Sequence, residues 1–213
     1  MADYICDPSE IYRQSLAAIR SETDLSRLPG DMVEVALRLV HACALPEIVS
    51  DLVWSPGAAD AGRRSLNRGA AILCDGEMTA NGIIRDRLPR NNEVICTVNE
   101  AKAKTIARER GTTRSAAGVE LWRSRIEGNV IAIGTAPTAL FRLLEILGET
   151  SERPALVLGF PVGFIGAAES KEALSRNPFG VPFIALKGRK GGSALAAAAV
   201  NALAAPFAPE EPR

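Results

Sequence analysis

The sequence predicts a three-layer α/β/α domain, with a mainly parallel sheet of about five strands and N-terminal helices packed on it. From residue 71 onward, short apolar runs of about four to six residues alternate with helical segments, which is the pattern of repeated βαβ units. The runs are continuously apolar, as in strands that are covered on both faces. The chain has 213 residues, of which 47% are hydrophobic and 23% charged, so it can bury a sizeable core.

The first predicted elements are two helices. Pro8–Arg20 begins with a proline and places its apolar residues at helical spacing. Leu28–Asp31 then breaks the chain with a Pro-Gly pair and ends in an aspartate suited to cap the next helix. That second helix, Met32–Ala44, is apolar almost all round, so we expect it to be largely buried.

The remaining elements alternate along the chain. The predicted strands are Ala71–Cys74, Val94–Val98, Val130–Ile133, Ala155–Leu158 and Val181–Leu186. The predicted helices between and after them are Glu100–Arg110, Ser115–Ser124, Pro137–Leu147, Ala167–Ser175 and Gly192–Ala204. We expect a single α/β domain over residues 1–205, followed by a flexible, proline-rich C-terminal tail over residues 206–213.

The composition argues against several classes of protein. Basic and acidic residues number 25 each, and aromatic residues make up 5% of the chain, so we expect no nucleic-acid partner. The four cysteines form no CxxC pair, which favours reduced cysteines in a cytosolic protein over a structural zinc site. We see no signal-peptide pattern, and the longest weakly polar run, residues 193–205, is too short to span a bilayer. We therefore expect a cytoplasmic protein with no membrane partner.

Glycine-rich loops follow four of the predicted strands. Ligands of open parallel sheets bind beyond the carboxyl ends of the strands, where such loops lie. Three loops lead directly into helix N-termini, which favour anions, and the last adds Lys187, Arg189 and Lys190. No P-loop or dinucleotide fingerprint is present, so a polycarboxylate is a candidate ligand. The loops are residues 75–78, 134–138, 159–166 and 187–193.

His41 is the single histidine, and it shares the one polar face of the second helix with Glu34 and Arg38. Such a polar strip is often structural. However, no other side chain here titrates near neutral pH without perturbation, so His41 is the default candidate for proton transfer. Arg38, one turn earlier, is able to bind a substrate carboxylate through two hydrogen bonds.

Other candidates for catalysis have weaker support. The sequence contains no GxSxG motif, while a pairing of Cys74 or Cys96 with His41 in space stays open. Asp75 and Glu77 offer two carboxylates for a metal ion, but carboxylates in such a loop are more often solvated or capping groups. A single histidine excludes metal sites that need two, so we expect no metal site.

Seven stretches of the chain carry a resemblance to one known family. They keep their order from about Tyr4 to Ala204, and PVGFIGAAESK and GRKGGS are specific in combination. The stretches are Tyr12–Ser15, Arg38–Cys43, Ile72–Met78, Thr113–Ala117, Ala136–Phe141, Pro161–Lys171 and Gly188–Ser193. Together they resemble precorrin-8X methylmutase.

The resemblance implies an isomerase of cobalamin biosynthesis. In that family a methyl group moves from carbon 11 to carbon 12 of the macrocycle, a 1,5-sigmatropic shift that turns precorrin-8X into hydrogenobyrinate. The resemblance also implies an α/β homodimer that needs no cofactor and has its active sites near the subunit interface. The family's catalytic histidine, a proton donor and acceptor, falls on His41. Its substrate-contacting residues fall on Ser15, Arg38, Arg114 and Ser115, to which we add Arg189 of the cationic loop.

Two positions depart from the family's pattern. Thr135 stands where the family often has asparagine, and Asn81 stands in a variable position. These two differences affect the expected contacts with the substrate and leave the expected reaction unchanged. Three other functions stay open: a cobalt-precorrin-8 methylmutase of the cobalt-first branch, a tetrapyrrole carrier that binds product tightly and passes it to the next enzyme, and a nucleotide-dependent transferase, for which we find no fingerprint.

Overall fold

The computed structural model describes residues 4–205 and contains one six-stranded sheet. The strand order is β1-β6-β5-β4-β2-β3, in which β2 to β6 run parallel and β1 pairs antiparallel with β6 at one edge. The mainly parallel sheet is thus confirmed, with the edge strand β1 as an addition to the five predicted strands. The strands are β1 Leu52–Trp54, β2 Ile72–Cys74, β3 Val94–Cys96, β4 Val130–Ile133, β5 Leu156–Gly159 and β6 Phe183–Leu186.

The seven predicted helices are all present, with small differences at their ends. Two further helices, α3 and α4, were not expected from the sequence. The helices are α1 Pro8–Glu22, α2 Gly30–Cys43, α3 Ala58–Asn67, α4 Glu77–Asn81, α5 Ala101–Arg110, α6 Arg114–Glu120, α7 Pro137–Glu149, α8 Ala167–Ser175 and α9 Ser193–Ala204. Short 3₁₀ helices are η1 Pro46–Asp51, η2 Arg85–Arg87 and η3 Arg123–Arg125. The predicted tail, residues 206–213, lies outside the described residues.

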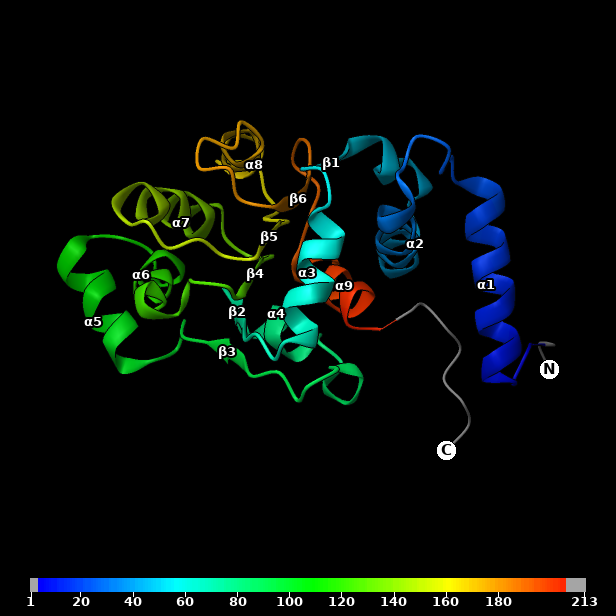
Figure 1. Ribbon diagram of the computed structural model, residues 1–213, viewed down its shortest axis with the longest axis horizontal. Coiled ribbons are helices and arrows are strands. Elements are labelled where there is room, and N and C mark those ends of the chain that lie inside the picture. The colour runs from blue at the N-terminus through cyan, green and yellow to red at the C-terminus, as the bar shows by residue number, and fades with distance from the viewer. Residues whose placement is uncertain (1–3, 206–213) are drawn as a thin grey trace.

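Helices cover both faces of the sheet (Figure 1). Helices α2, α3 and α9 build the core on one face, and α6, α7 and α8 build the core on the other. Neighbouring residues of one strand point into opposite cores, as Ile72 and Leu73 do in β2. Both faces are therefore apolar, which explains the continuous apolar runs in the sequence.

Two helices lie outside these layers. Helix α1 packs mainly against α2, and α5 packs mainly against α6 (Figure 1). None of the residues of α1 is fully buried. Its N-terminus is capped by Asp7, whose carboxylate accepts a hydrogen bond from the Glu10 amide at 3.0 Å. Packing on α2 fixes which residues of α1 can reach a site there.

Helix α9 is the central helix of its layer. Nine of its residues are buried, and most of these are alanines, so other helices can approach it closely. A Cβ atom at Gly62 in α3 would lie 2.6 Å from the Leu156 side chain and 2.9 Å from that of Leu203, so any larger residue would displace these buried leucines. Along residues 4–205, no helix combines the length and the apolar character needed to cross a membrane.

Candidate active site

Three of the predicted site residues lie together where α1 meets α2. The Ser15 hydroxyl oxygen is 3.1 Å from Nδ1 of His41, and a guanidinium nitrogen of Arg38 donates to the Tyr12 hydroxyl at 3.4 Å. The rings of Tyr12 and His41 are tilted by 42° with their centroids 5.5 Å apart. The packing of these two helices therefore joins a hydroxyl, an imidazole and a guanidinium in one cluster.

This cluster forms one side of a cavity of about 280 Å³. Tyr12, Arg38 and His41 line it together with Ala194 and Asn201 of α9. The small side chains of α9 leave the space open beside the imidazole. The volume is at the lower end of ordinary ligand pockets, so the cavity suits one edge of a macrocycle and not a whole ring. The lining is completed by Ala42, Gly82, Ala197 and Ala198.

Burial is uneven along α2. Residues of its middle turns are buried as expected, and Arg38 is only 7% exposed, whereas His41 in the last turn is exposed. Partial burial and the nearby charge of Arg38 both lower the pKa of His41 below its ordinary value. The resting protein therefore holds a mostly neutral imidazole near pH 7, and a hydroxyl at Nδ1 can fix which nitrogen carries the proton.

The predicted residues Arg114 and Ser115 lie elsewhere on the carboxyl edge of the sheet, at the start of α6. A guanidinium nitrogen of Arg114 donates to the side-chain oxygen of Asn99 at 3.5 Å, and Asn99 donates to Glu77 at 3.3 Å. Neither Arg114 nor Ser115 lines the His41 cavity. Asn99 follows β3 and Glu77 opens α4, so this chain of contacts runs along the same edge towards α4.

Arg189 lies in the loop between β6 and α9. Its guanidinium carbon is 5.3 Å from the centre of the Phe164 ring, a cation–π distance. Phe164 and Ile165 are 83% and 90% exposed, so an apolar surface stands beside this cation. Helix α9 starts shortly after Arg189, and Ala194 in its first turn lines the His41 cavity. The predicted site residues therefore lie in three places: Ser15, Arg38 and His41 form one cluster, Arg114 and Ser115 open α6, and Arg189 lies in the loop before α9.

The metal interpretation of Asp75 is not supported by its surroundings. Its buried carboxylate accepts backbone N–H groups from Gly134 at 2.9 Å, Thr135 at 2.9 Å and Ala136 at 2.8 Å. Burial raises the pKa of Asp75, and these three hydrogen bonds counteract that rise. The carboxylate thus ties the loop after β2 to the start of α7. Within residues 4–205, no three His, Cys, Asp or Glu side chains are grouped as metal ligands.

Cys74 and Cys96 are unsuited to act as nucleophiles. Neither Cys74 nor Cys96 lines the His41 cavity. Burial raises the pKa of the Cys74 thiol far above its ordinary value and that of Cys96 to about 11. Both thiols therefore stay protonated at neutral pH.

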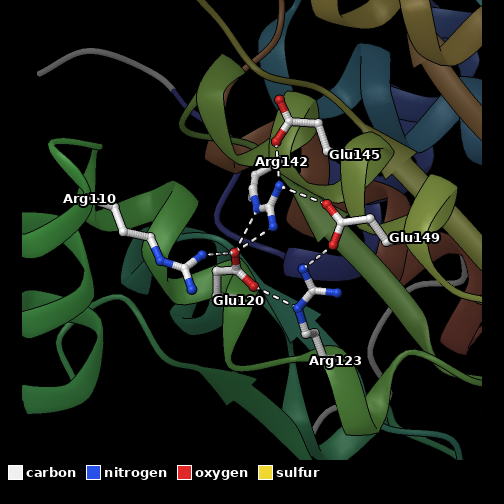
Figure 2. A network of polar contacts seen from close by, with 6 residues as sticks. All are labelled: Arg110, Glu120, Arg123, Arg142, Glu145 and Glu149. Carbon is white, nitrogen blue, oxygen red and sulfur yellow. Dashed lines mark hydrogen bonds and ion pairs between the residues drawn. The ribbon is translucent and has the colours of Figure 1, made fainter.

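A network of ion pairs holds α6 in place (Figure 2). One carboxylate oxygen of Glu120 accepts from Arg110 at 2.6 Å and from Arg142 at 2.5 Å, and the other accepts from Arg123 at 2.7 Å. Arg142 and Arg123 also reach Glu149, at 3.3 and 2.5 Å. Glu120 is the last residue of α6, and Arg114 is the first. The network therefore fixes the helix that presents Arg114 and Ser115.

Sequence reasoning did not assign a role to Tyr12, although its stretch contributed to the resemblance. It lies three residues before Ser15 and so shares a face of α1 with it. This three-residue spacing is the feature of the sequence that places Tyr12 beside Ser15. Its contacts with Arg38 and His41 depend on how α1 packs against α2.

Comparisons with known proteins agree with this architecture. The family model described as precorrin-8X methylmutase matches residues 10–205. A precorrin-8X methylmutase from Pseudomonas aeruginosa is 57% identical over 204 residues, which cover 96% of this chain and 98% of that protein. One from a Sinorhizobium species is 52% identical, with coverage of 96% and 97%. A crystal structure of a precorrin-8X methylmutase from Thermus thermophilus matches with a TM-score of 0.83 at 36% identity, covering 92% of this chain and 94% of that one. The chain belongs to the precorrin-8X methylmutase family, whose members are isomerases of cobalamin biosynthesis.

Proposed function

We propose that this protein moves a methyl group from carbon 11 to carbon 12 of precorrin-8X to give hydrogenobyrinate, with His41 as proton donor and acceptor. The observation that carries the proposal is the Ser15–His41 contact of 3.1 Å at a cavity that Arg38 also lines. An imidazole oriented by a hydroxyl and next to a guanidinium combines a proton carrier with a carboxylate-binding group.

The reaction requires no redox agent and no nucleophile. The bond from the methyl group to carbon 11 breaks, the bond to carbon 12 forms, and the ring's double bonds shift, so no atom is gained or lost overall. A proton or hydrogen bond from His41 to the ring draws electron density away and favours the shift, and the proton returns to His41 afterwards. When Ser15 donates its hydroxyl proton to Nδ1, the neutral imidazole carries its own proton on Nε2.

The other predicted residues bind the rim of the substrate. Precorrin-8X carries acetate and propionate carboxylates around an apolar ring. In this proposal Arg38, Arg114, Ser115 and Arg189 bind carboxylates, while exposed apolar side chains cover the ring. Large exposed hydrophobic side chains that could cover the ring lie in α4 and in the loop after β5: Met78, Val162, Phe164 and Ile165.

We infer that two copies of the chain form the working enzyme. The 280 Å³ cavity covers only part of a tetrapyrrole, so a second chain is suited to enclose the remainder. Exposed apolar residues near the N-terminus and after α2 offer surface for such a contact: Tyr4, Ile5, Ile11 and Leu45. Sedimentation measurements at micromolar concentration test this. We place the reaction in the cytoplasm and propose direct transfer of the product to the next enzyme.

Incubation of the purified protein with precorrin-8X, followed by absorption spectroscopy, tests the activity. We expect conversion of many equivalents of substrate per protein, whereas a carrier would give only a stoichiometric spectral change. His41→Ala is expected to abolish turnover and to retain binding of the ring. Near-wild-type turnover in that variant would refute the role of His41. The same assay with cobalt-precorrin-8 distinguishes the two pathway branches, and we expect the metal-free substrate to be preferred because the two relatives reported above, at 57% and 52% identity, are named for it.

A further inference from the structure

Lys171 is a buried cation that the proposed reaction does not use. It lies in α8, its side chain belongs to the largest fully buried ones in the protein, and the residue is 1% exposed. Its amine donates to the backbone carbonyl of Lys190 at 2.5 Å. Among residues 4–205 no carboxylate lies within ion-pair distance of this amine. Lysines are almost never buried without such a partner, so the position calls for a physical explanation.

The carbonyl that Lys171 binds belongs to the loop that carries Arg189. Two further backbone contacts join this loop to the one after β5: the Gly163 amide donates to the Arg189 carbonyl at 3.2 Å, and the Gly192 amide donates to the Phe160 carbonyl at 2.7 Å. A Cβ atom at Gly191 would clash with the carbonyl oxygen of Phe160, so this close approach of the two loop backbones requires glycine.

We propose that Lys171 is a positioning residue for the anion-binding edge: it fixes the Lys187–Ser193 loop and places a positive charge beneath it that strengthens binding of an acidic ligand at Arg189. This inference rests on the proposed function, because the ligand is the polycarboxylate ring. The amine holds the backbone next to Arg189. Because the charge is shielded from solvent, salt screens it less than the charges of exposed lysines.

The surrounding charges are compatible with this role. Burial lowers the pKa of Lys171 to about 8, and Asp51 opposes that shift. Asp51 is itself 3.3 Å from the ammonium group of Lys190, which also approaches Glu47 at 4.0 Å. Both carboxylates, Asp51 and Glu47, therefore form ion pairs with Lys190. A bound polycarboxylate adds negative charge above the loop and stabilises the protonated form of Lys171.

Two measurements on the intact protein test the proposal. The first is titration calorimetry of wild-type protein with hydrogenobyrinate, in two buffers of different ionisation enthalpy, at pH 6.5 and pH 8. The pKa of Lys171 is lowered to about 8, so its amine can take up a proton on binding at pH 8, where His41 is neutral. At pH 6.5 Lys171 is already protonated, and uptake there reports His41. We expect net proton uptake on binding at pH 8. No uptake at pH 8 would overturn the proposed charge effect even if no variant folds.

The second measurement compares Lys171→Met with Lys104→Met, which removes an exposed lysine of α5. Lys171→Met is expected to raise KM about tenfold, leave kcat within about twofold, and abolish the proton uptake at pH 8. Lys104→Met is expected to leave KM, kcat and the proton uptake at pH 8 unchanged. A Lys171→Met protein with unchanged KM and undiminished proton uptake would refute the proposal. Wild-type turnover of precorrin-8X is measured in parallel. Absence of turnover in the wild type would refute the proposed function, whereas the comparison of the two variants tests only the role of Lys171.

Discussion

The hydroxyl of Ser15 and Nδ1 of His41 are 3.1 Å apart, in hydrogen-bond contact between α1 and α2. A hydroxyl can accept from a protonated nitrogen or donate to an unprotonated one. Ser15 can therefore keep its contact with His41 while the imidazole gains and loses a proton. A backbone carbonyl could only accept at this position, and an ammonium group could only donate.

Ser15→Ala is expected to lower kcat about tenfold and to change KM little, because the imidazole loses the group that fixes its tautomer and orientation. Steady-state assays with precorrin-8X measure this. Ser21→Ala is the matched control, since the Ser21 hydroxyl bonds only to the carbonyl of Ala18 in the same helix. Equal effects of the two substitutions would mean that Ser15 acts through the stability of α1.

The parallel sheet and its covering helices could be predicted because their apolar runs are continuous in sequence. β1 could not, because it is defined by its antiparallel pairing with β6, which is distant in the sequence. Helix α3 contains Gly62, and a glycine inside a helix lowers its intrinsic helix propensity. Its position depends on the close approach of Gly62 to Leu156 and Leu203, which no local pattern reveals.

The site was predictable in part. His41 and Arg38 stand out because they are polar residues on an apolar helix. Ser15 was identified only through the family resemblance, because its contact with His41 depends on the packing of two separate helices. The same packing brings in Tyr12. The buried position of Lys171 follows from the course of the loop around Lys190, so its sequence context gave no sign of it.

The pH dependence of kcat/KM follows from the environment of His41. Burial and the charge of Arg38 lower its pKa below the ordinary value of 6.5. If the protonated imidazole donates to the ring, kcat/KM is highest below this pKa and falls as the pH rises through it. We expect a descending limb with its midpoint below pH 6.5. Rates measured between pH 5 and 8 in the wild type check this.

A substitution at Arg38 moves that midpoint in a defined direction. Without the neighbouring positive charge, the pKa of His41 rises, so the descending limb of Arg38→Ala is expected at higher pH than that of the wild type. A rate that increases with pH through this window would instead identify the neutral imidazole as the active form.

Arg38→Ala is also expected to weaken ring binding more than it disturbs folding. The guanidinium lines the cavity and donates to the Tyr12 hydroxyl at 3.4 Å, and a guanidinium is the side-chain group best suited to bind a carboxylate through two hydrogen bonds. We expect the Kd for hydrogenobyrinate to rise about tenfold or more, as is typical for loss of a charge-assisted hydrogen bond. Tyr12→Phe, which removes only the partner hydroxyl, is the control. A large drop in Tm with unchanged affinity would make Arg38 a structural residue.

Glu120→Gln is expected to destabilise the protein by about 2 kcal/mol, because three arginines lose their shared carboxylate. The Glu120 side chain is 9% exposed, so water does not readily replace it. Burial alone would raise the pKa of Glu120. The hydrogen bonds from Arg123 and Arg142 lower it by more than this, so the pKa lies below its ordinary value. The stabilisation by ionised Glu120 is therefore fully present above the pKa that Glu120 has in the unfolded state. It is lost as the pH falls through the lower pKa of Glu120 in the folded state.

Thermal unfolding at pH 7 measures this effect, and Glu145→Gln supplies the control. Glu145 contacts the same Arg142 at 2.6 Å (Figure 2). Its side chain is 60% exposed, so its loss is expected to cost no more than about 0.5 kcal/mol. For a chain of this length, about 2 kcal/mol corresponds to a decrease in Tm of about 5 °C. The difference in Tm between Glu120→Gln and wild type is expected to shrink at pH 4. Equal Tm values for the two variants at pH 7 would show that Glu120 is no more important than a surface charge, and that α6 is held by its apolar contacts with α7.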